Sequence, residues 1–302
     1  MVHVDIKTLL KQISEGDFRS LARAISLVEN ESNGYHELLT GLHSDTKIPV
    51  IGITGPPGAG KSTLVNALVE YLSTENKKIG VIAIDPTSPF NYGSLLGDRI
   101  RMAEQFNKPN VFIRSLATRG SLGGLSAKII EVSDVMKSAG FDYILIETVG
   151  VGQSEVEITG LADTTVVVLV PEGGDDIQGI KSGLMEIADI FVVNKSDREG
   201  ADQFANSLKK MLHQREKHDW TIPVLAIIAD KKTGIDELLK QIHNHAGHAN
   251  SSKKEYLLCE KAYRLIENQR MKNVDKTILK QEISKALAKG GFNLYAFVAG
   301  KF

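Results

Sequence analysis

The chain contains a single cysteine, Cys259, in 302 residues, so no disulfide can form within it and its fold depends on a packed core. Aromatic residues make up only 6% of the sequence, and the most apolar run, residues 166–170, is far too short to cross a bilayer. The first residues, Met1-Val2-His3-Val4-Asp5, lack the basic and then apolar regions of a secretory signal. These absences predict a cytoplasmic protein without a membrane segment.

Neither sign of charge prevails in the sequence. The 36 Lys and Arg residues against 37 Asp and Glu residues give a net charge of −1, and the pI is near 6.7. Such a balance provides no whole-chain attraction to nucleic acid or to an anionic membrane, and we expect neither as a partner. Hydrophobic residues account for 42% of the chain, which is ample for a core, so function has to be inferred from individual sites.

The order of apolar patterns predicts an α/β protein. Residues 4–43 carry two apolar stripes at helical spacing on either side of Gly16, and we expect a helical lead-in there. Short β-branched runs then alternate with helical stretches, which is typical of a mainly parallel sheet with helices on both faces and ligands at the carboxyl ends of its strands. The expected strands are residues 48–54, 78–84, 111–114, 143–147, 164–170, 190–194 and 224–228.

A phosphate-binding loop follows the first expected strand. Residues 55–62 match the pattern G-x-x-x-x-G-K-[ST] between a strand and a helix, so backbone N–H groups and the helix N-terminus would bind phosphate. Lys61 would reach the β- and γ-phosphates of a nucleotide, and the Ser62 hydroxyl would bind Mg²⁺. The nucleotide contacts expected here are Pro57, Gly58, Ala59, Gly60, Lys61, Ser62 and Thr63.

Acidic residues end two further strands. Asp85 stands after residues 78–84, where it could hold Mg²⁺ or cap the turn before Pro86. Glu147 ends another strand and is the candidate that positions Mg²⁺, with the Gly150 backbone bonding the γ-phosphate. Val151 follows, where Ras-like enzymes carry a water-orienting Gln. Its side chain forms no hydrogen bond, so we expect slow hydrolysis by the isolated protein.

The sequence Asn194-Lys195-Ser196-Asp197 matches the guanine-recognition pattern N-K-x-D after a strand. The Asp197 carboxylate can accept from the guanine N1–H and 2-amino groups, which adenine does not present in that way. Asn194 would brace the loop and Lys195 would cover the base. The final guanine element is expected at Ile228, Ala229 and Asp230, where a backbone N–H would meet O6.

Three further segments have ordinary explanations on their residues alone. The glycine-rich run 173–181 is typical of a strand-to-helix connection. His243, His245 and His248 close a helix without a second ligand group, so a solvated helix end is favoured over a metal site. Residues 251–289 predict two amphipathic helices, which either pack on their own core or form an arm against a second subunit.

Taken together, the motifs resemble one family, the MeaB/ArgK-type GTPases with the human counterpart MMAA. The segments D-P-T-S-P, G-D-R-I-R-M and E-T-V-G-V-G-Q-S-E are far more specific than the phosphate loop alone. Members of the family were formerly labelled lysine/arginine/ornithine transport ATPases or kinases. The resemblance covers most of the chain, apart from a missing Ser before Ala229 and a divergent tail at residues 290–302.

The resemblance implies a Mg²⁺-dependent GTPase of the SIMIBI-type P-loop fold. Its cofactors would be GTP or GDP with Mg²⁺, and its partner would be the adenosylcobalamin-dependent methylmalonyl-CoA mutase, whose cofactor loading it gates and which it protects from inactivation. The acids that look grouped around Mg²⁺ are Asp85, Asp98 and Glu147, and the residues that look like a partner-sensing loop are Asp175, Gln178 and Lys181.

The resemblance also implies a homodimer and a division of the chain into three parts. These are a helical extension at 1–45, a GTPase domain at 46–248 and a C-terminal dimerisation arm at 249–302. Two other functions remain open. One is a GTP-dependent nickel or cobalt metallochaperone, against which stands the lack of a Cys-x-x-Cys pair. The other is an ATPase or kinase linked to basic amino-acid transport, which the N-K-x-D motif disfavours.

Overall fold

A computed structural model describes residues 5–43, 48–85, 105–117, 128–148, 158–171, 182–213, 220–248 and 251–301. The chain divides into two compact units, Met1–Leu257 and Leu258–Phe302, which are described separately below. Among the described residues, no helix combines the length and the apolar character that a membrane crossing requires.

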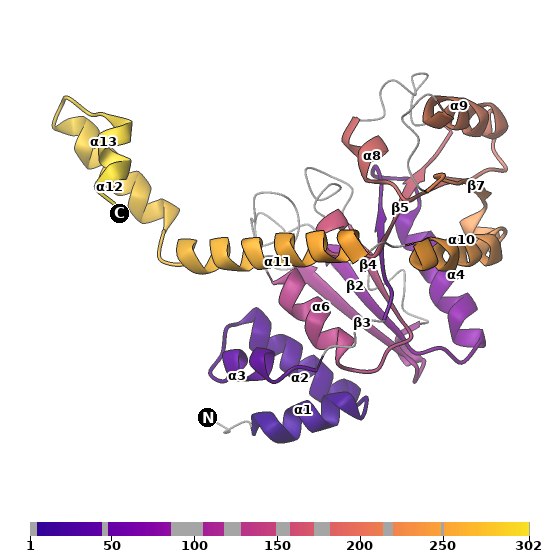
Figure 1. Cartoon of the computed structure of the whole chain (residues 1–302), viewed down its shortest axis with the longest axis horizontal. Helices are drawn as coiled ribbons and strands as arrows, with labels where there is room; N and C mark the ends of the chain where they lie inside the picture. The colour runs from indigo at the N-terminus through magenta and orange to yellow at the C-terminus, as the bar shows by residue number, and fades with distance from the viewer. Residues whose placement is uncertain are drawn as a thin grey trace. The chain divides into compact units, whose positions relative to one another are not determined.

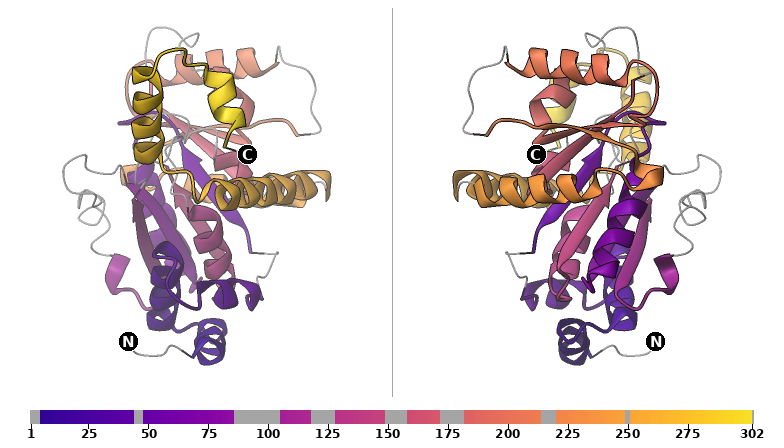
Figure 2. Two further views of the ribbon diagram at one scale, coloured as in Figure 1. Left: turned by 90° about the vertical axis from the view of Figure 1, so that its left-hand side faces the viewer. Right: turned by 90° about the vertical axis from the view of Figure 1, so that its right-hand side faces the viewer.

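The first unit is built on a seven-stranded sheet (Figure 1). Its strands run in the order β3-β2-β4-β1-β5-β6-β7, and every neighbouring pair is parallel. Figure 2 shows the twist of these strands relative to one another. The strands are β1 (Val50–Thr54), β2 (Ile79–Asp85), β3 (Val111–Ala117), β4 (Tyr143–Glu147), β5 (Thr164–Leu169), β6 (Ile190–Asn194) and β7 (Val224–Ile227).

The α/β fold predicted from the alternating pattern is confirmed, with each expected strand present. The central strands β1, β4, β5 and β6 are buried along their whole length. A strand covered on both faces needs apolar side chains on both faces, which is why these strands appear as continuous apolar runs in the sequence. The expected boundaries differ mainly at β3, which continues to Ala117.

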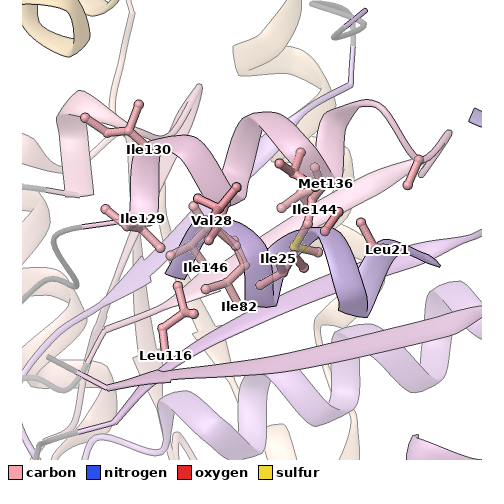
Figure 3. Packing of buried hydrophobic residues seen from close by; sticks show 14 of the residues in the cluster. Leu21, Ile25, Val28, Ile82, Leu116, Ile129, Ile130, Met136, Ile144 and Ile146 are labelled. Atoms are coloured by element: carbon pink, nitrogen blue, oxygen red, sulfur yellow. The ribbon is translucent and has the colours of Figure 1, made fainter. Parts of the chain in front are cut away.

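Helices α2 (Phe18–Glu29) and α6 (Ile129–Lys137) pack together over one half of the sheet. Figure 3 shows the apolar side chains between them and the strands, among them Ile25, Val28, Ile82 and Ile146. The lead-in helices α1 (Ile6–Ser14) and α3 (Tyr35–Thr40) join the same core. The expected N-terminal helices therefore exist and are part of the first unit's core.

The opposite face of the sheet is covered by α4 (Lys61–Thr74) and α10 (Ile235–His248). The other half of the first face carries α8 (Ser182–Ile187) and α9 (Ala201–His213). Three single-turn 3₁₀ helices complete the described elements of this unit: η1 (Gln105–Asn107), η2 (Ile158–Gly160) and η4 (Ala229–Lys231). Helices on both faces leave the two ends of the sheet as the places where polar groups gather.

The end at which the strands begin, here called the amino edge, is fixed by aspartates. Asp163 Oδ2 accepts the Val50 N–H at 2.8 Å, and Asp189 Oδ2 accepts the Thr165 N–H at 2.8 Å. Asp142 Oδ2 accepts the Lys78 N–H at 2.7 Å. Each aspartate precedes one strand and bonds a backbone group at the start of a strand, so it satisfies a donor that the ladder leaves open.

The second unit consists of the end of α11 (Ser251–Met271), α12 (Lys276–Ala288) and α13 (Leu294–Ala299). Two helices are expected in this region from the sequence, and α13 is an addition that begins at the Asn293 cap. No side chain of α12 or α13 is buried. Large apolar side chains on the surface of this unit include Tyr263, Ile266, Ile278, Leu287 and Tyr295.

Candidate nucleotide site

The end at which the strands finish, here called the carboxyl edge, carries the phosphate loop between β1 and α4. Gly55 has φ +138°, and a Cβ there would lie 2.1 Å from Val168 O. Gly60 has φ +87°, and a Cβ there would lie 2.3 Å from Asn194 Nδ2. Both positions require glycine. The loop therefore lies close against its neighbours and leads directly into the N-terminus of α4, where backbone N–H groups bind anions.

Lys61, the first residue of α4, lies back over this loop. Its Nζ donates to Gly55 O at 2.9 Å and to Pro56 O at 3.0 Å, and only 7% of the residue is exposed. The ammonium group is thus held next to the phosphate loop by two carbonyl groups. A phosphate bound in the loop would offer stronger, charged acceptors to the same ammonium.

Ser62 and Glu147 form the part of the site that suits a cation. Ser62 Oγ donates to Glu147 Oε1 at 2.6 Å, and Glu147 ends β4 in register with Ile53 of β1. The next residue is fixed as well, because Thr148 Oγ1 donates to Thr54 Oγ1 at 2.9 Å. Hydroxyl and carboxylate oxygens are the ligands that Mg²⁺ prefers, so this pair fits the metal beside the phosphate loop. Asp85 ends the neighbouring strand β2.

Asn194 joins the phosphate loop to the turn expected to face the base. Its Nδ2 donates to Ala59 O at 2.9 Å, and its Oδ1 accepts the Ala229 N–H at 3.1 Å. The residue ends β6 and is only 2% exposed. Both functions of its amide are therefore used in buried hydrogen bonds between two loops, as the bracing role predicted from the sequence requires.

Lys195 and Asp197 lie on the more exposed side of the same loop. Lys195 has φ +56°, and its Nζ donates to Gly58 O at 3.0 Å. Asp197 Oδ2 accepts from Lys231 Nζ at 2.8 Å. This hydrogen bond from Lys231 lowers the pKa of Asp197 and raises the pKa of Lys231. Asp197 is therefore a carboxylate throughout the neutral range, as guanine recognition requires.

The structure does not place every residue that the sequence singles out. Six lie outside the described residues: Asp98, Gly150, Val151, Asp175, Gln178 and Lys181. The others share the carboxyl edge, and their roles stay predictions. Two of the backbone N–H groups expected to meet guanine O6 already have acceptors within the protein. The Ala229 N–H donates to Asn194 Oδ1 at 3.1 Å, and the Ile228 N–H donates to Thr233 O at 3.2 Å.

The histidines of α10 correct one expectation. His245 is only 4% exposed, so the prediction of a solvated position is wrong for this residue. Its Nδ1 shares a hydrogen bond with Thr164 Oγ1 at 2.8 Å, and its Nε2 lies 3.1 Å from Asp189 Oδ1. His243 Nε2 shares a hydrogen bond with Tyr143 Oη at 2.7 Å. Within the described ranges, no group of three or more His, Cys, Asp or Glu residues could hold a metal ion.

Sequence reasoning missed Lys231 and the pairing of Thr148 with Thr54. Lys231 stands two residues beyond Ala229, but no pattern in one sequence indicates which acid a surface lysine will reach. Thr54 and Thr148 each follow or end an apolar strand, and their 0% and 1% exposure separates them from ordinary loop threonines. In the sequence, a polar residue at the end of a buried apolar strand is the feature that indicates such a buried hydrogen bond.

Comparison with known proteins gives a consistent result. Residues 21–285 match the family model described as methylmalonyl Co-A mutase-associated GTPase MeaB. A protein of Pyrococcus horikoshii, provisionally named a GTPase, is 44% identical over 289 residues, covering 94% of this chain and 90% of its own length.

Two further similarities point the same way. The GTPase ArgK of Escherichia coli is 39% identical over 240 residues, covering 76% of this chain and 72% of its own. A solved structure described as a LAO/AO transport system kinase superposes with a TM-score of 0.68 at 25% identity, over 99% of this chain and 98% of that one.

Proposed function

Because the chain belongs to the MeaB family of methylmalonyl-CoA mutase-associated GTPases, we propose that its GTP hydrolysis serves a mutase. In this proposal the protein binds GTP and Mg²⁺ at the carboxyl edge of the sheet. It then acts as a chaperone that gates cofactor loading into a cobalamin-dependent acyl-CoA mutase, methylmalonyl-CoA mutase in the first instance, and protects that enzyme. The GTPase activity follows from the family, whereas the partner and the metal are the proposed parts.

The observation that carries the nucleotide site is the double hydrogen bond of Asn194. One side chain joins Ala59 in the phosphate loop to Ala229 in the turn of η4. The cradle for phosphates and the elements expected to face the base are thereby held at a fixed spacing. A fixed spacing between a phosphate subsite and a base subsite is what a site for a whole nucleoside triphosphate needs.

The chemistry proposed for the site is phosphoryl transfer to water. The Lys61 ammonium would leave Gly55 O and Pro56 O for the phosphates and neutralise charge that develops between the β- and γ-phosphates. Ser62 and Glu147 would hold Mg²⁺ directly or through water, and the bound metal would supply further charge neutralisation. Asp197 would accept from the guanine N1–H and 2-amino groups.

A chaperone role requires that hydrolysis respond to the partner. Val151 stands where a water-orienting side chain is expected, so the isolated protein is proposed to hydrolyse GTP slowly. The mutase would then order the attacking water through the segment that contains Asp175, Gln178 and Lys181. Residues 249–302 are proposed as a dimerisation arm beside a GTPase domain at 46–248 and a helical extension at 1–45.

A turnover assay tests this function. GTP hydrolysis is measured with the protein alone, with purified methylmalonyl-CoA mutase, and with an unrelated acyl-CoA enzyme as the control. We expect a slow basal rate that rises at least about tenfold with the mutase only, because one missing catalytic contact is restored. A fast basal rate that no mutase changes would rule out the chaperone role while leaving the GTPase assignment intact.

A nucleotide competition experiment addresses the kinase alternative. One similar solved structure is described as a transport system kinase, and a kinase of that kind would use ATP. We expect GTP to displace a bound fluorescent GDP analogue at least about a hundredfold more effectively than ATP, since adenine lacks the N1–H and 2-amino donors that the Asp197 carboxylate would accept. Equal displacement by ATP would favour the alternative.

A further inference from the structure

An ion pair joins the two loops that are proposed to face the guanine base. Lys231, the last residue of η4, reaches across to Asp197 of the β6 loop, with Nζ 2.8 Å from Oδ2. The same two segments also meet through backbone, because the Ser196 N–H donates to Ile227 O at 3.1 Å. Lys231 of η4 therefore contacts the residue of the β6 loop that the guanine pattern singles out.

We propose that Lys231 is a positioning residue for guanine recognition, which holds the Asp197 carboxylate in the orientation that reads the base. The proposal rests on the proposed function, because Asp197 is the base reader only within that assignment. Lys231 itself belongs to no part of the N-K-x-D pattern and is not adjacent to it in the sequence.

The contact leaves the carboxylate able to bind a base. A carboxylate has about four lone-pair directions on its two oxygens. Among the side-chain hydrogen bonds of the described residues, Lys231 uses one of these directions, on Oδ2, so Oδ1 can accept one guanine donor and Oδ2 keeps a second direction for the other. An ammonium is a compact point charge and does not clamp both oxygens as a guanidinium does. The geometry thus favours support of the base contact over competition with it.

The turn that carries Lys231 is itself anchored. Ala229 at its start is bonded to Asn194, and Lys232 just after its end forms an ion pair with Glu70 on α4. Lys231 therefore extends from a turn that is fixed to both the β6 loop and the phosphate-loop helix. A side chain based on a fixed turn can order a carboxylate on a neighbouring loop, which a lysine on a loose loop could not do.

The exposure of the Lys231 and Asp197 side chains distinguishes a role in nucleotide binding from a role in the stability of the fold. The side chains of Lys231 and Asp197 are 60% and 39% exposed, and ion pairs with such exposure contribute little to the stability of the fold. The contribution of Lys231 is expected in nucleotide affinity, since an unrestrained Asp197 would have to be ordered when the base binds. Thermal stability and base affinity therefore respond differently to its removal.

The test compares GDP with IDP, whose hypoxanthine base lacks the 2-amino group. In Lys231→Ala we expect the Kd for GDP to rise roughly three- to tenfold, as one side chain must be ordered on binding. The preference for GDP over IDP should fall, because a loosened Asp197 discriminates the 2-amino group less well. Lys231→Arg keeps a charged donor but can also occupy both oxygens of Asp197, so it should recover only part of the loss. Tm should match that of the wild-type protein.

Lys240→Ala is the matched control, since Lys240 forms a similar exposed ion pair with Glu237 on α10. The proposal is overturned if Lys231→Ala binds GDP as tightly as the wild type or more tightly, or if its affinities for GDP and IDP fall by the same factor. Asp197→Ala distinguishes a failure of the base-reading role of Asp197 from a failure of the positioning role of Lys231. An unchanged GDP affinity in that variant contradicts the base reader itself, whereas a loss there without a loss in Lys231→Ala contradicts only the role of Lys231.

Discussion

The two edges of the sheet use polar side chains in different ways. At the amino edge, Asp142, Asp163 and Asp189 accept backbone N–H groups at the starts of strands. At the carboxyl edge, Lys61 donates to carbonyls of its own loop and Ser62 donates to Glu147. The first set completes the hydrogen bonding of the sheet, whereas the second joins groups that a nucleotide and a metal ion would separate.

This difference explains how one fold can be both stable and responsive. The aspartates at the amino edge bond backbone N–H groups far from the proposed ligands. Losing one of these hydrogen bonds therefore lowers the free energy of unfolding. At the carboxyl edge, Lys61 and Ser62 use hydrogen bonds to neighbouring groups of the protein. In the proposed function, a bound nucleotide and Mg²⁺ would take the place of these protein partners, so Lys61 and Ser62 would keep polar partners in both states.

The largest effect is expected from Lys61→Ala at the carboxyl edge. The variant loses the ammonium that would neutralise the transferring phosphoryl group, so kcat for GTP should fall by at least about a hundredfold. The fold should change little, because the bonds lost are to two carbonyls of one loop. The measurement is single-turnover GTP hydrolysis together with Tm. Hydrolysis within a factor of two of the wild type would contradict the proposed position of the phosphates.

Asp189→Ala at the amino edge should give the converse result. It removes the acceptor of the Thr165 N–H and the partner of buried His245, and we expect a loss of about 3 kcal/mol in the free energy of unfolding. GDP affinity should not change, because the residue precedes β6 and the site follows it. Denaturant unfolding and GDP titration measure the two quantities. The matched variant Asp197→Ala should weaken GDP binding and leave unfolding nearly unchanged, and the comparison fails if both variants act alike.

Asn194 lies at the carboxyl edge, but we expect it to contribute to stability as well as to nucleotide binding. Asn194→Ala leaves Ala59 O and the Ala229 N–H buried without their partner, so we expect about 2 kcal/mol less stability. GDP affinity should fall about tenfold as well, because the spacing of the two subsites is lost.

Asn110→Ala is the control for this double effect. Asn110 Nδ2 donates to Lys77 O at 2.7 Å and its Oδ1 accepts from Ser73 Oγ at 3.2 Å, away from the carboxyl edge. Its replacement should lower stability by about 1 kcal/mol without changing GDP affinity. If Asn194→Ala changes stability alone, the bracing role in nucleotide binding is wrong.

The sequence allowed prediction of the fold and of the site's main residues for a simple physical reason. Strands buried on both faces need unbroken apolar runs, and a residue that must reach a ligand stands where such a run ends. Glu147 and Asn194 both end buried strands, so their positions followed from the pattern. Long-range pairings carry no such signal, and for this reason Lys231 was not foreseen as the partner of Asp197.

The burial of His245 is indicated by the apolar spacing of its helix. Ile235, Leu238 and Ile242 form the buried stripe of α10, and residue 245 continues the same spacing. A histidine on an apolar stripe requires a polar partner inside the protein, and Thr164 and Asp189 provide it. The sequence alone gave no indication that these residues, which start or precede β5 and β6, would lie within reach.

The smallest expected effect concerns a charge at the amino edge. Lys78 Nζ donates to Ala139 O at 3.0 Å and lies 5.3 Å and 5.5 Å from the ring centres of Phe18 and Phe141. Burial lowers the pKa of Lys78, and the charge of Asp142 opposes this shift only in part. The folded protein therefore releases this proton at a lower pH than the unfolded chain does.

The free energy of unfolding should consequently rise with pH just below the ordinary lysine pKa of about 10.4, because the unfolded chain holds more protons there. Burial raises the pKa of Tyr143 at the same edge, which gives the opposite slope above about pH 10. Subtracting the profile of Lys78→Met, which keeps the apolar stem and the tyrosine, isolates the lysine. A difference profile that is flat or falls over this interval would show that the aromatic pair accommodates the charge fully, and the amino edge would then be as tolerant of ionisation as the carboxyl edge.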